Sequence, residues 1–310
     1  MAQAIKLKKT PPIYRRKIRL STGEKVFYAI AYTVISLLIL AVAYPLIYIV
    51  SASFSSASAV SSGQVVLWPV QPSLKGYETV FNYPSIWRSY GNTIFYTTAA
   101  TALNIAMTMI CAYPLARKGL PHKGFFTFLF SFTMMFSGGM IPSYLLMRDL
   151  HLLNTRWALI LPGAMAVYQM VVTRTFIQST IPTELLEATQ VDGCSDFRFF
   201  FQFVLPLSKA VIAVIALQYA IAHWNDYFHA FLYLSNDELY PLQITLRKIL
   251  IMSQIANSEI EDPELAAAMV GMADLMKYAL IVVASAPIMC IYPFIQKYFV
   301  QGVMIGSLKG

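Results

Sequence analysis

Long apolar stretches alternate with short polar segments along almost the whole chain. A helix that crosses a membrane needs about 20 mainly apolar residues, and six stretches meet this condition. They cover residues 26–50, 92–116, 125–147, 157–177, 207–234 and 275–300. None of them shows the regular alternation of apolar and polar positions that is typical of membrane β-strands. The pattern predicts an all-α, polytopic membrane protein with six transmembrane helices.

The composition supports this class. Hydrophobic residues make up 57% of the 310 residues, charged residues only 12%, and the mean hydropathy is +0.58. Soluble domains carry roughly 25% charged residues. We therefore divide the chain into an N-terminal tail (1–25), a six-helix transmembrane domain (26–300) and a C-terminal tail (301–310).

The positions of Lys and Arg predict the orientation in the membrane. They are concentrated in residues 1–25, in the loop at 117–123 and around the segment 181–206. Because positive charge is enriched in cytoplasmic segments, both termini and segment 181–206 are expected on the cytoplasmic side. The net charge of +8 then reports topology, and nucleic-acid binding is not expected. The first apolar run, about 25 residues long, exceeds the 7–15 of a signal peptide, which predicts a retained span.

Segment 181–206 is a charged, amphipathic island between apolar runs. Its carboxylates and Arg198 would be costly in hydrocarbon, so it should lie outside the bilayer core. Pro182 suits the first position of a short helix, and Gly193 suits its end. The apolar positions of this helix are expected to form one stripe. They are Leu185, Leu186, Ala188 and Val191.

Glu187-Ala188, Gly193 and Leu205-Pro206 in this island resemble the loop shared by permease subunits of ABC importers, with Thr189 where the pattern has alanine. The C-terminal sequence PFIQKYFVQGVMIGSLKG is similar to the endings of maltose-type carbohydrate permeases, especially those that import complex oligosaccharides. The resemblance runs from about Pro45 to the end of the chain.

The resemblance implies the type I ABC importer permease fold in a bacterial cytoplasmic membrane. In this family the loop forms a coupling helix that docks on a separate ATPase. The implied partners are a second permease subunit, two ATPase subunits, an extracellular solute-binding protein and the lipid bilayer. An ordinary solvated loop is the alternative. The implied coupling residues are Glu184, Glu187, Ala188, Thr189, Asp192 and Gly193.

A second polar cluster lies in the fifth apolar stretch. It consists of Trp224, Asn225, Asp226 and Tyr227. Because Asp inside a membrane is costly, the cluster should face a partner or a wet cavity. It could form a wall of the translocation path, where aromatic rings stack on sugars and polar groups bind hydroxyls. A polar clamp between helices, or an aromatic belt at the interface, is the equal alternative.

Three further features are assigned to packing. Ser137-Gly138-Gly139 with Pro142 interrupts the third stretch; it could be a gating kink, but close helix packing by small residues is favoured. Asn104 and Gln218 are interpreted as hydrogen-bond partners between helices.

The chain offers no site for chemistry of its own. It contains no Gly-Lys dipeptide and thus no phosphate-binding loop, so ATP and Mg²⁺ should be bound by the partner ATPase, and no cofactor is expected here. The cysteines and histidines lack metal-ligand spacing. We therefore predict a transport subunit without catalytic residues. The rivals are an ion-coupled secondary transporter that uses Asp226, and a membrane-embedded transferase; amino acids, peptides or phosphate are lesser alternatives to sugar as the substrate.

Overall fold

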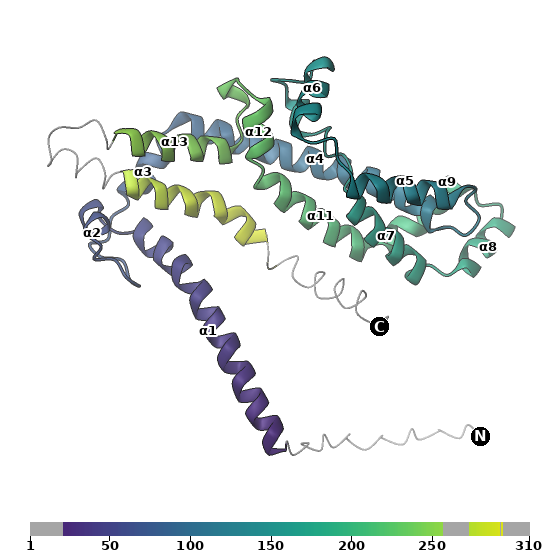
Figure 1. Ribbon diagram of the computed structural model, residues 1–310, viewed down its shortest axis with the longest axis horizontal. Helices are drawn as coiled ribbons and strands as arrows, with labels where there is room; N and C mark the ends of the chain where they lie inside the picture. Colours follow the sequence, from purple (N-terminus) through teal and green to yellow (C-terminus); the bar gives the residue numbers. More distant parts are fainter. Residues whose placement is uncertain (1–20, 257–272, 292, 294–310) are drawn as a thin grey trace, which may run out of the picture. The chain divides into compact units, whose positions relative to one another are not determined.

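The computed structural model describes residues 21–256, 273–291 and 293, and this part of the chain is helical, with no β-strand (Figure 1). The chain divides into two compact units, residues 1–48 and 49–310. Most of the first unit that is described belongs to α1, Thr22–Ser53. The most apolar window of α1 has a mean hydropathy of 2.4 and no buried residue. A helix that is apolar on all sides suits a membrane span, which agrees with the first predicted stretch.

The second unit is a succession of helices, most of them short. Its helical elements are α2 (Ala57–Ser61), α3 (Lys75–Phe81), α4 (Pro84–Ala116), α5 (Lys123–Met135), α6 (Met140–Asp149), η1 (Arg156–Leu159), α7 (Val167–Thr180), α8 (Thr183–Val191), α9 (Asp196–Phe199), the π-helical η2 (Phe200–Val204), α10 (Leu205–Leu207), α11 (Lys209–Trp224), α12 (Phe228–Tyr233), η3 (Asp237–Leu239), α13 (Leu242–Ala256) and a helix at Ala273–Ile291.

Helix α4 is the centre of this unit, because α11, α7, α13 and α3 all pack on it. It begins with Pro84, whose fixed φ suits the first helical position. Its buried face carries polar side chains: Asn104 and Thr108 are fully buried, whereas Ile94 and Ile110 on the other side are exposed. This pattern is the reverse of a soluble helix and is typical of a membrane helix that uses polar side chains to bind its neighbours.

The polar face of α4 holds two irregular segments of backbone. Near its start, the Asn92 amide donates to the carbonyl of Glu238 at 2.7 Å, and the Tyr96 hydroxyl donates to the carbonyl of Leu239 at 2.9 Å. Further along, the Asn104 amide donates to the carbonyl of Gly163. Irregular backbone at membrane depth persists only where protein or water satisfies its hydrogen bonds. Asn104 meets this requirement at Gly163, which lies within the fourth predicted span.

Helix α11 completes the same network from the opposite side. His223 Nε2 lies 2.7 Å from Asn104 Oδ1, and the Tyr219 hydroxyl lies 2.8 Å from Thr108 Oγ1. The same Tyr219 oxygen accepts the N–H of Ala166 at 3.1 Å. Gln218 bonds to Gln169 of α7. The predictions that Asn104 and Gln218 join helices are confirmed.

The third predicted span is not one straight helix. Helix α5 stops at Met135 and α6 starts at Met140, with a bend of 110° between them. Gly139 has φ +85°, which glycine adopts without steric cost. A Cβ on Gly139 would meet no atom within 4 Å. The sequence therefore correctly indicated a break, but close packing of these glycines, the favoured explanation, is wrong within this chain.

The fourth and fifth predicted spans are also interrupted. The fourth contains Pro162 and Gly163, which separate η1 from α7 and leave α7 with 14 residues. That is fewer than the roughly 20 residues of a spanning helix. The fifth is divided at Asn225, where α11 ends, and a bend of 76° at Ser208 precedes it. A hydropathy window cannot detect these breaks because the interrupting residues are few and the segments around them are strongly apolar.

Among the described residues, three helices are long and apolar enough to cross a membrane: α1, α4 and the helix at Ala273–Ile291. Five spans result if the α5–α6 pair and the Asp196–Trp224 pair each count as one. The end of the sixth predicted stretch (residues 294–300) lies outside the described residues. So do residues 1–20 of the predicted N-terminal tail and the whole predicted C-terminal tail (301–310). Six spans and the sidedness of the termini therefore stay predictions.

We expect Asn104→Leu to lower the stability of the protein in detergent. The substitution keeps the branched shape of the side chain but leaves the Gly163 carbonyl without its partner, at a cost of about 1–3 kcal/mol. Thermal unfolding followed by intrinsic fluorescence measures the effect. Thr98→Ala on the exposed side of α4 is the control, because its hydroxyl bonds only to carbonyls of its own helix. Equal melting temperatures for the two variants would contradict the role of Asn104.

Candidate functional site

Helix α8 forms a short knob at one end of the second unit, between α7 and α9 in the chain (Figure 1). It starts at Thr183, one residue later than predicted, with Pro182 as its N-cap. It ends in two backbone hydrogen bonds, from Cys194 N–H to the Thr189 carbonyl at 2.9 Å and from Gly193 N–H to the Gln190 carbonyl at 3.0 Å. This is a Schellman motif, and Gly193 has the positive φ of +74° that the motif requires.

The inner face of α8 differs from the predicted apolar stripe. Leu185 and Leu186 are partly buried, and Thr189 is only 8% exposed. Ala188 and Val191, the other two members of the expected stripe, point to solvent. The physical reason is the helical spacing, because residues 185, 186 and 189 share one face of a helix whereas 188 and 191 lie on another.

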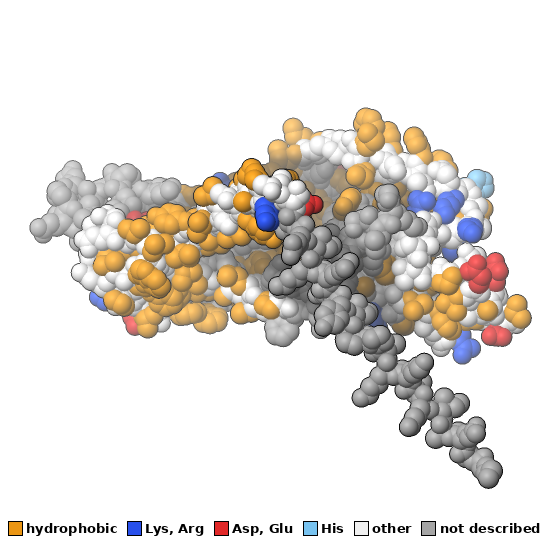
Figure 2. Space-filling view, turned by 90° about the horizontal axis from the view of Figure 1, so that it is seen from below, with side chains coloured by type: hydrophobic (Ala, Val, Ile, Leu, Met, Phe, Trp, Pro, Cys, Tyr) orange, Lys and Arg blue, Asp and Glu red, His pale blue; other side chains and the backbone are white. Residues whose placement is uncertain are grey.

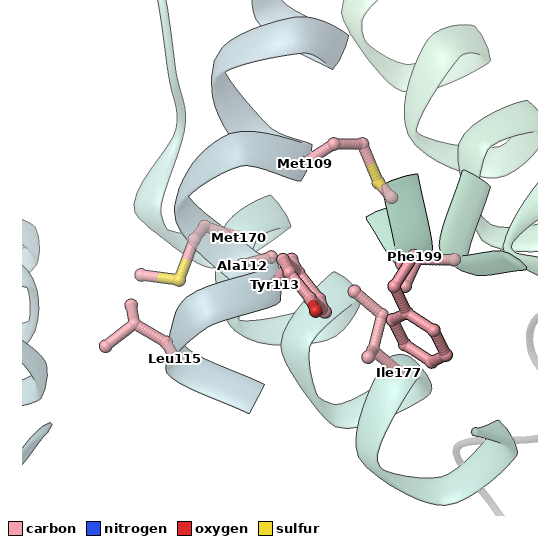
Figure 3. Packing of buried hydrophobic residues seen from close by; sticks show 8 residues of the cluster. Met109, Ala112, Tyr113, Leu115, Met170, Ile177 and Phe199 are labelled. Atoms are coloured by element: carbon pink, nitrogen blue, oxygen red, sulfur yellow. The ribbon is translucent and has the colours of Figure 1, made fainter. Parts of the chain in front are cut away.

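The inner face packs on a cluster of buried apolar side chains, which we call the α8-side cluster (Figure 3). Helix α4 provides four of its members, from Met109 to Leu115, and α7 provides Met170 and Ile177. Phe199 and Val204, which follow the knob in the chain, complete it. The knob therefore rests on the apolar end of α4, not on its polar face.

The outer face of α8 carries Glu184, Glu187, Ala188 and Val191 at positions i, i+3, i+4 and i+7, and all four are exposed. Val191 is 88% exposed, and Phe197 just beyond the knob is 81% exposed. In the described part of the chain no ion pair involves Glu184, Glu187 or Asp192. Figure 2 shows that Lys, Arg and acidic side chains gather at this end of the unit, whereas apolar side chains dominate elsewhere on the face shown. An acidic and apolar face on a capped helix can bind a protein surface of opposite charge.

The second predicted cluster lies at the break between α11 and α12. Trp224 is buried; its indole N–H donates to the carbonyl of Ala284 at 3.1 Å, and its ring meets Tyr90 edge-on with centroids 5.9 Å apart. Of the two interpretations of this cluster, Trp224 fits the clamp between helices.

The other three residues shape the break itself. The Asn225 amide donates to the carbonyl of Ile221 at 2.9 Å at the end of α11. The Asp226 carboxylate accepts the backbone N–H of His229 at 3.2 Å and lies 2.9 Å from His229 Nδ1. Tyr227 lies under the guanidinium of Arg247, 4.6 Å from its ring centroid. Asp226 therefore already has a partner within the chain.

Sequence reasoning missed His223, Arg247 and the ion pair between Arg117 and Asp196, whose Nη1 and Oδ1 atoms are 2.7 Å apart. Each of these residues meets a partner distant in sequence, such as Asn104 for His223. No local pattern could have identified them.

Comparison with known proteins agrees with this geometry. The family described as the inner membrane component of binding-protein-dependent transport systems matches residues 17–305. The chain belongs to this family, so it is a membrane-embedded permease subunit and not an enzyme.

Two curated relatives come from Bacillus subtilis (strain 168). LplC is 40% identical over 266 residues, which cover 86% of this chain and 89% of LplC. The polygalacturonan/rhamnogalacturonan transport system permease protein YtcP is 37% identical over 287 residues, which cover 93% of this chain and 99% of YtcP.

A solved structure gives the same fold. It is the crystal structure of a bacterial ABC transporter involved in the import of the acidic polysaccharide alginate. One of its chains matches with a TM-score of 0.82 and 33% identity, covering 91% of this chain and 99% of that one. The chain therefore has the type I importer permease fold.

We expect Gly193→Val to loosen the end of α8. A β-branched residue at φ +74° is strained by about 1–2 kcal/mol, and the two closing hydrogen bonds weaken in consequence. Hydrogen exchange at the amides of residue 193 and Cys194 reports this directly. Gly119→Ala is the matched control, since a Cβ at Gly119 would meet no atom within 4 Å and its φ is not positive. Unchanged exchange in Gly193→Val would contradict the motif.

Proposed function

We propose that this chain is one of two permease subunits of an ATP-driven oligosaccharide importer, coupled to a separate ATPase through the outer face of α8. The observation that carries the proposal is that outer face: four exposed positions on one side of a helix that is rigidly capped and held from behind. Exposed apolar side chains such as Val191, rimmed by charge, are typical of a protein-binding surface.

In this proposal Glu184, Glu187 and Asp192 face basic residues of the ATPase, and Ala188 and Val191 fill its cleft. Thr189 and Gly193 do not contact the ATPase in this proposal. Thr189 packs against the protein on the inner face of α8, and Gly193 ends the helix. ATP and Mg²⁺ are held by the ATPase. Its closure carries α8 with it and turns the path from inward-facing to outward-facing. A second permease subunit and an extracellular solute-binding protein complete the importer.

The substrate class rests on the relatives. YtcP is named for polygalacturonan and rhamnogalacturonan, and the similar solved transporter imports alginate. We propose an oligosaccharide as the substrate of this chain too. Asn225, Asp226 and Tyr227 would face the path at the α11–α12 break, where the exposed Asn225 amide and the partly exposed Asp226 carboxylate can bind hydroxyls. Trp224 would hold that break in place.

We expect Glu187→Lys to reduce recovery of the ATPase when the tagged chain is purified from its native membrane. Reversal of a charge at the centre of an interface costs about 2 kcal/mol or more, which is roughly a 30-fold loss of affinity. Quantitative mass spectrometry of the purified complex measures the loss. Glu78→Lys, the same charge change on exposed α3, is the control. The coupling role of α8 fails if both variants retain equal amounts of ATPase.

The energy source distinguishes this proposal from ion-coupled transport by Asp226. Vesicles that contain the complex with its co-purified partners should transport oligosaccharide only when ATP is present on the side of the membrane where the ATPase is bound. Ionophores that remove proton and sodium gradients should leave the initial rate within about twofold, because no carboxylate needs to be protonated in each cycle. Uptake that follows the ion gradient and ignores ATP would support the alternative. Comparing neutral with uronic-acid oligosaccharides in the same assay identifies the sugar class.

A further inference from the structure

Arg117 and Asp196 join the end of α4 to the segment that follows the α8 knob. Arg117 is the C-cap of α4, and Asp196 is the first residue of α9. Their Nη1 and Oδ1 atoms are 2.7 Å apart, which is the distance of a charge-assisted hydrogen bond. These two residues are far apart in the sequence, so the ion pair is a tertiary contact between the end of α4 and the start of α9.

Arg117 is held in place from two sides. Its guanidinium lies 5.9 Å from the centroid of the Tyr113 ring, and its carbonyl accepts a hydrogen bond from Lys123 Nζ at 2.9 Å. Tyr113 in turn contacts the ring of Phe200, with centroids 5.3 Å apart. The Lys123 bond holds the backbone of Arg117, and the Tyr113 ring, itself part of the α8-side cluster, lies under its guanidinium.

Asp196 lies close to the knob in the chain. Only Cys194 and Ser195 separate it from Gly193, and the Ser195 hydroxyl caps α9 by accepting the N–H of Arg198 at 3.3 Å. A displacement of α8 must therefore displace the Asp196 carboxylate as well, since no flexible linker lies between them.

The packing around this ion pair is incomplete. A cavity of about 630 Å³ opens beside it, lined on the α4 side by Ile110 and Pro114 and on the other side by Phe197 and Phe201. Close-packed side chains resist relative movement, but here a hollow separates the two elements. Tyr113 packs on the rings of Phe199 and Phe200 deeper in the unit. At this edge, where the hollow replaces such contacts, the ion pair adds a link between the end of α4 and the segment after α8.

We propose that Arg117 and Asp196 are positioning residues that make α4 follow the movement of α8. The proposal rests on the proposed function, in which the ATPase moves α8. When the knob is displaced, the ion pair transfers that displacement to α4, the helix on which α11, α7, α13 and α3 pack. Without the pair, the apolar contacts of the α8-side cluster carry the displacement alone, and the hollow leaves room for α4 to lag behind α8. ATP would then be hydrolysed with less sugar moved.

This role differs from a contribution to folding. The Asp196 side chain is 56% exposed and the Arg117 side chain 26% exposed, and ion pairs of this kind contribute little to stability. Variants of the pair are therefore expected to fold and to assemble, which makes the coupling between hydrolysis and transport measurable.

The test uses the complex of the full chain with its co-purified partners, reconstituted in vesicles. Arg117→Gln and Asp196→Asn each remove one charge, and the double variant Arg117→Asp with Asp196→Arg reverses the pair. The quantity measured is oligosaccharide taken up per ATP hydrolysed. We expect each single variant to lower this ratio by about twofold to fivefold, as suits a partly exposed ion pair, and the reversed pair to restore it. Lys118→Gln, next to Arg117 and exposed, controls for loss of positive charge alone.

The outcomes are distinct. Single variants with the wild-type ratio overturn the proposal, and so does a lowered ratio that the reversed pair does not restore or that Lys118→Gln reproduces. The amount of ATPase bound to each variant is measured in the same samples and should equal that of the wild type. If no ATPase accompanies even the wild-type chain, the proposed function fails and the positioning role fails with it. If the ATPase is present and the ratios are unchanged, only the positioning role fails.

Discussion

The buried polar face of α4 is the feature on which the rest of the second unit depends. Water cannot satisfy backbone groups within a membrane, so every irregular segment there needs partners from the protein. The segment at 160–166 interrupts the fourth predicted span, and Asn104 of α4 donates to its backbone. Asn92 and Tyr96 of the same helix donate to the backbone of η3, which carries the exposed Asp237 and Glu238. These bonds allow a membrane protein to contain breaks where a simple bundle would have straight helices.

Two kinds of packing follow one another along α4. From Ser89 to Thr108 its contacts include many hydrogen bonds, such as the one of 2.6 Å between Ser89 Oγ and Thr245 Oγ1. From Met109 to Leu115 its contacts are apolar, within the α8-side cluster. Hydrogen bonds are directional and fix their partners in one arrangement, whereas the apolar contacts near the knob are not directional and border a hollow. The end of the unit that carries the knob is therefore the part with room to adjust, and in the proposed role the ion pair of Arg117 with Asp196 limits that adjustment.

Part of this architecture could be predicted from the sequence. Helical class, the break at Gly139, the end of α8 at Gly193 and the bonding role of Asn104 all depend on local chemistry: hydropathy, backbone freedom and the cost of a buried amide. The family was also evident from Glu187, Gly193 and Pro206, because their spacing survives the change to Thr189.

The remainder could not be predicted because it depends on contacts between distant residues. Helical spacing puts Thr189 on the same face as Leu185 and Leu186. That this face is the buried one depends on the residues of α4 and α7 that lie behind α8. The division of the fourth stretch is stable because Asn104 and Tyr219 satisfy its backbone, and hydropathy alone does not include those partners. The same holds for Trp224, whose indole N–H finds the Ala284 carbonyl 60 residues away.

The uniformly apolar surface of α1 has a consequence for how the protein is made. Insertion of a helix from the translocon is favoured by each Leu, Ile, Val or Phe by about 0.3–0.6 kcal/mol and opposed by polar side chains. Helix α1 is rich in Leu, Ile and Val, so it can insert into the bilayer during synthesis without contacts to other helices. Helix α4, with Asn92 and Asn104 on its face, gains its full stability only after α11 and η3 have been synthesised. Helix α1 can therefore insert stably before the later helices are made, whereas α4 reaches its final stability only after the helices that pack on it have been inserted.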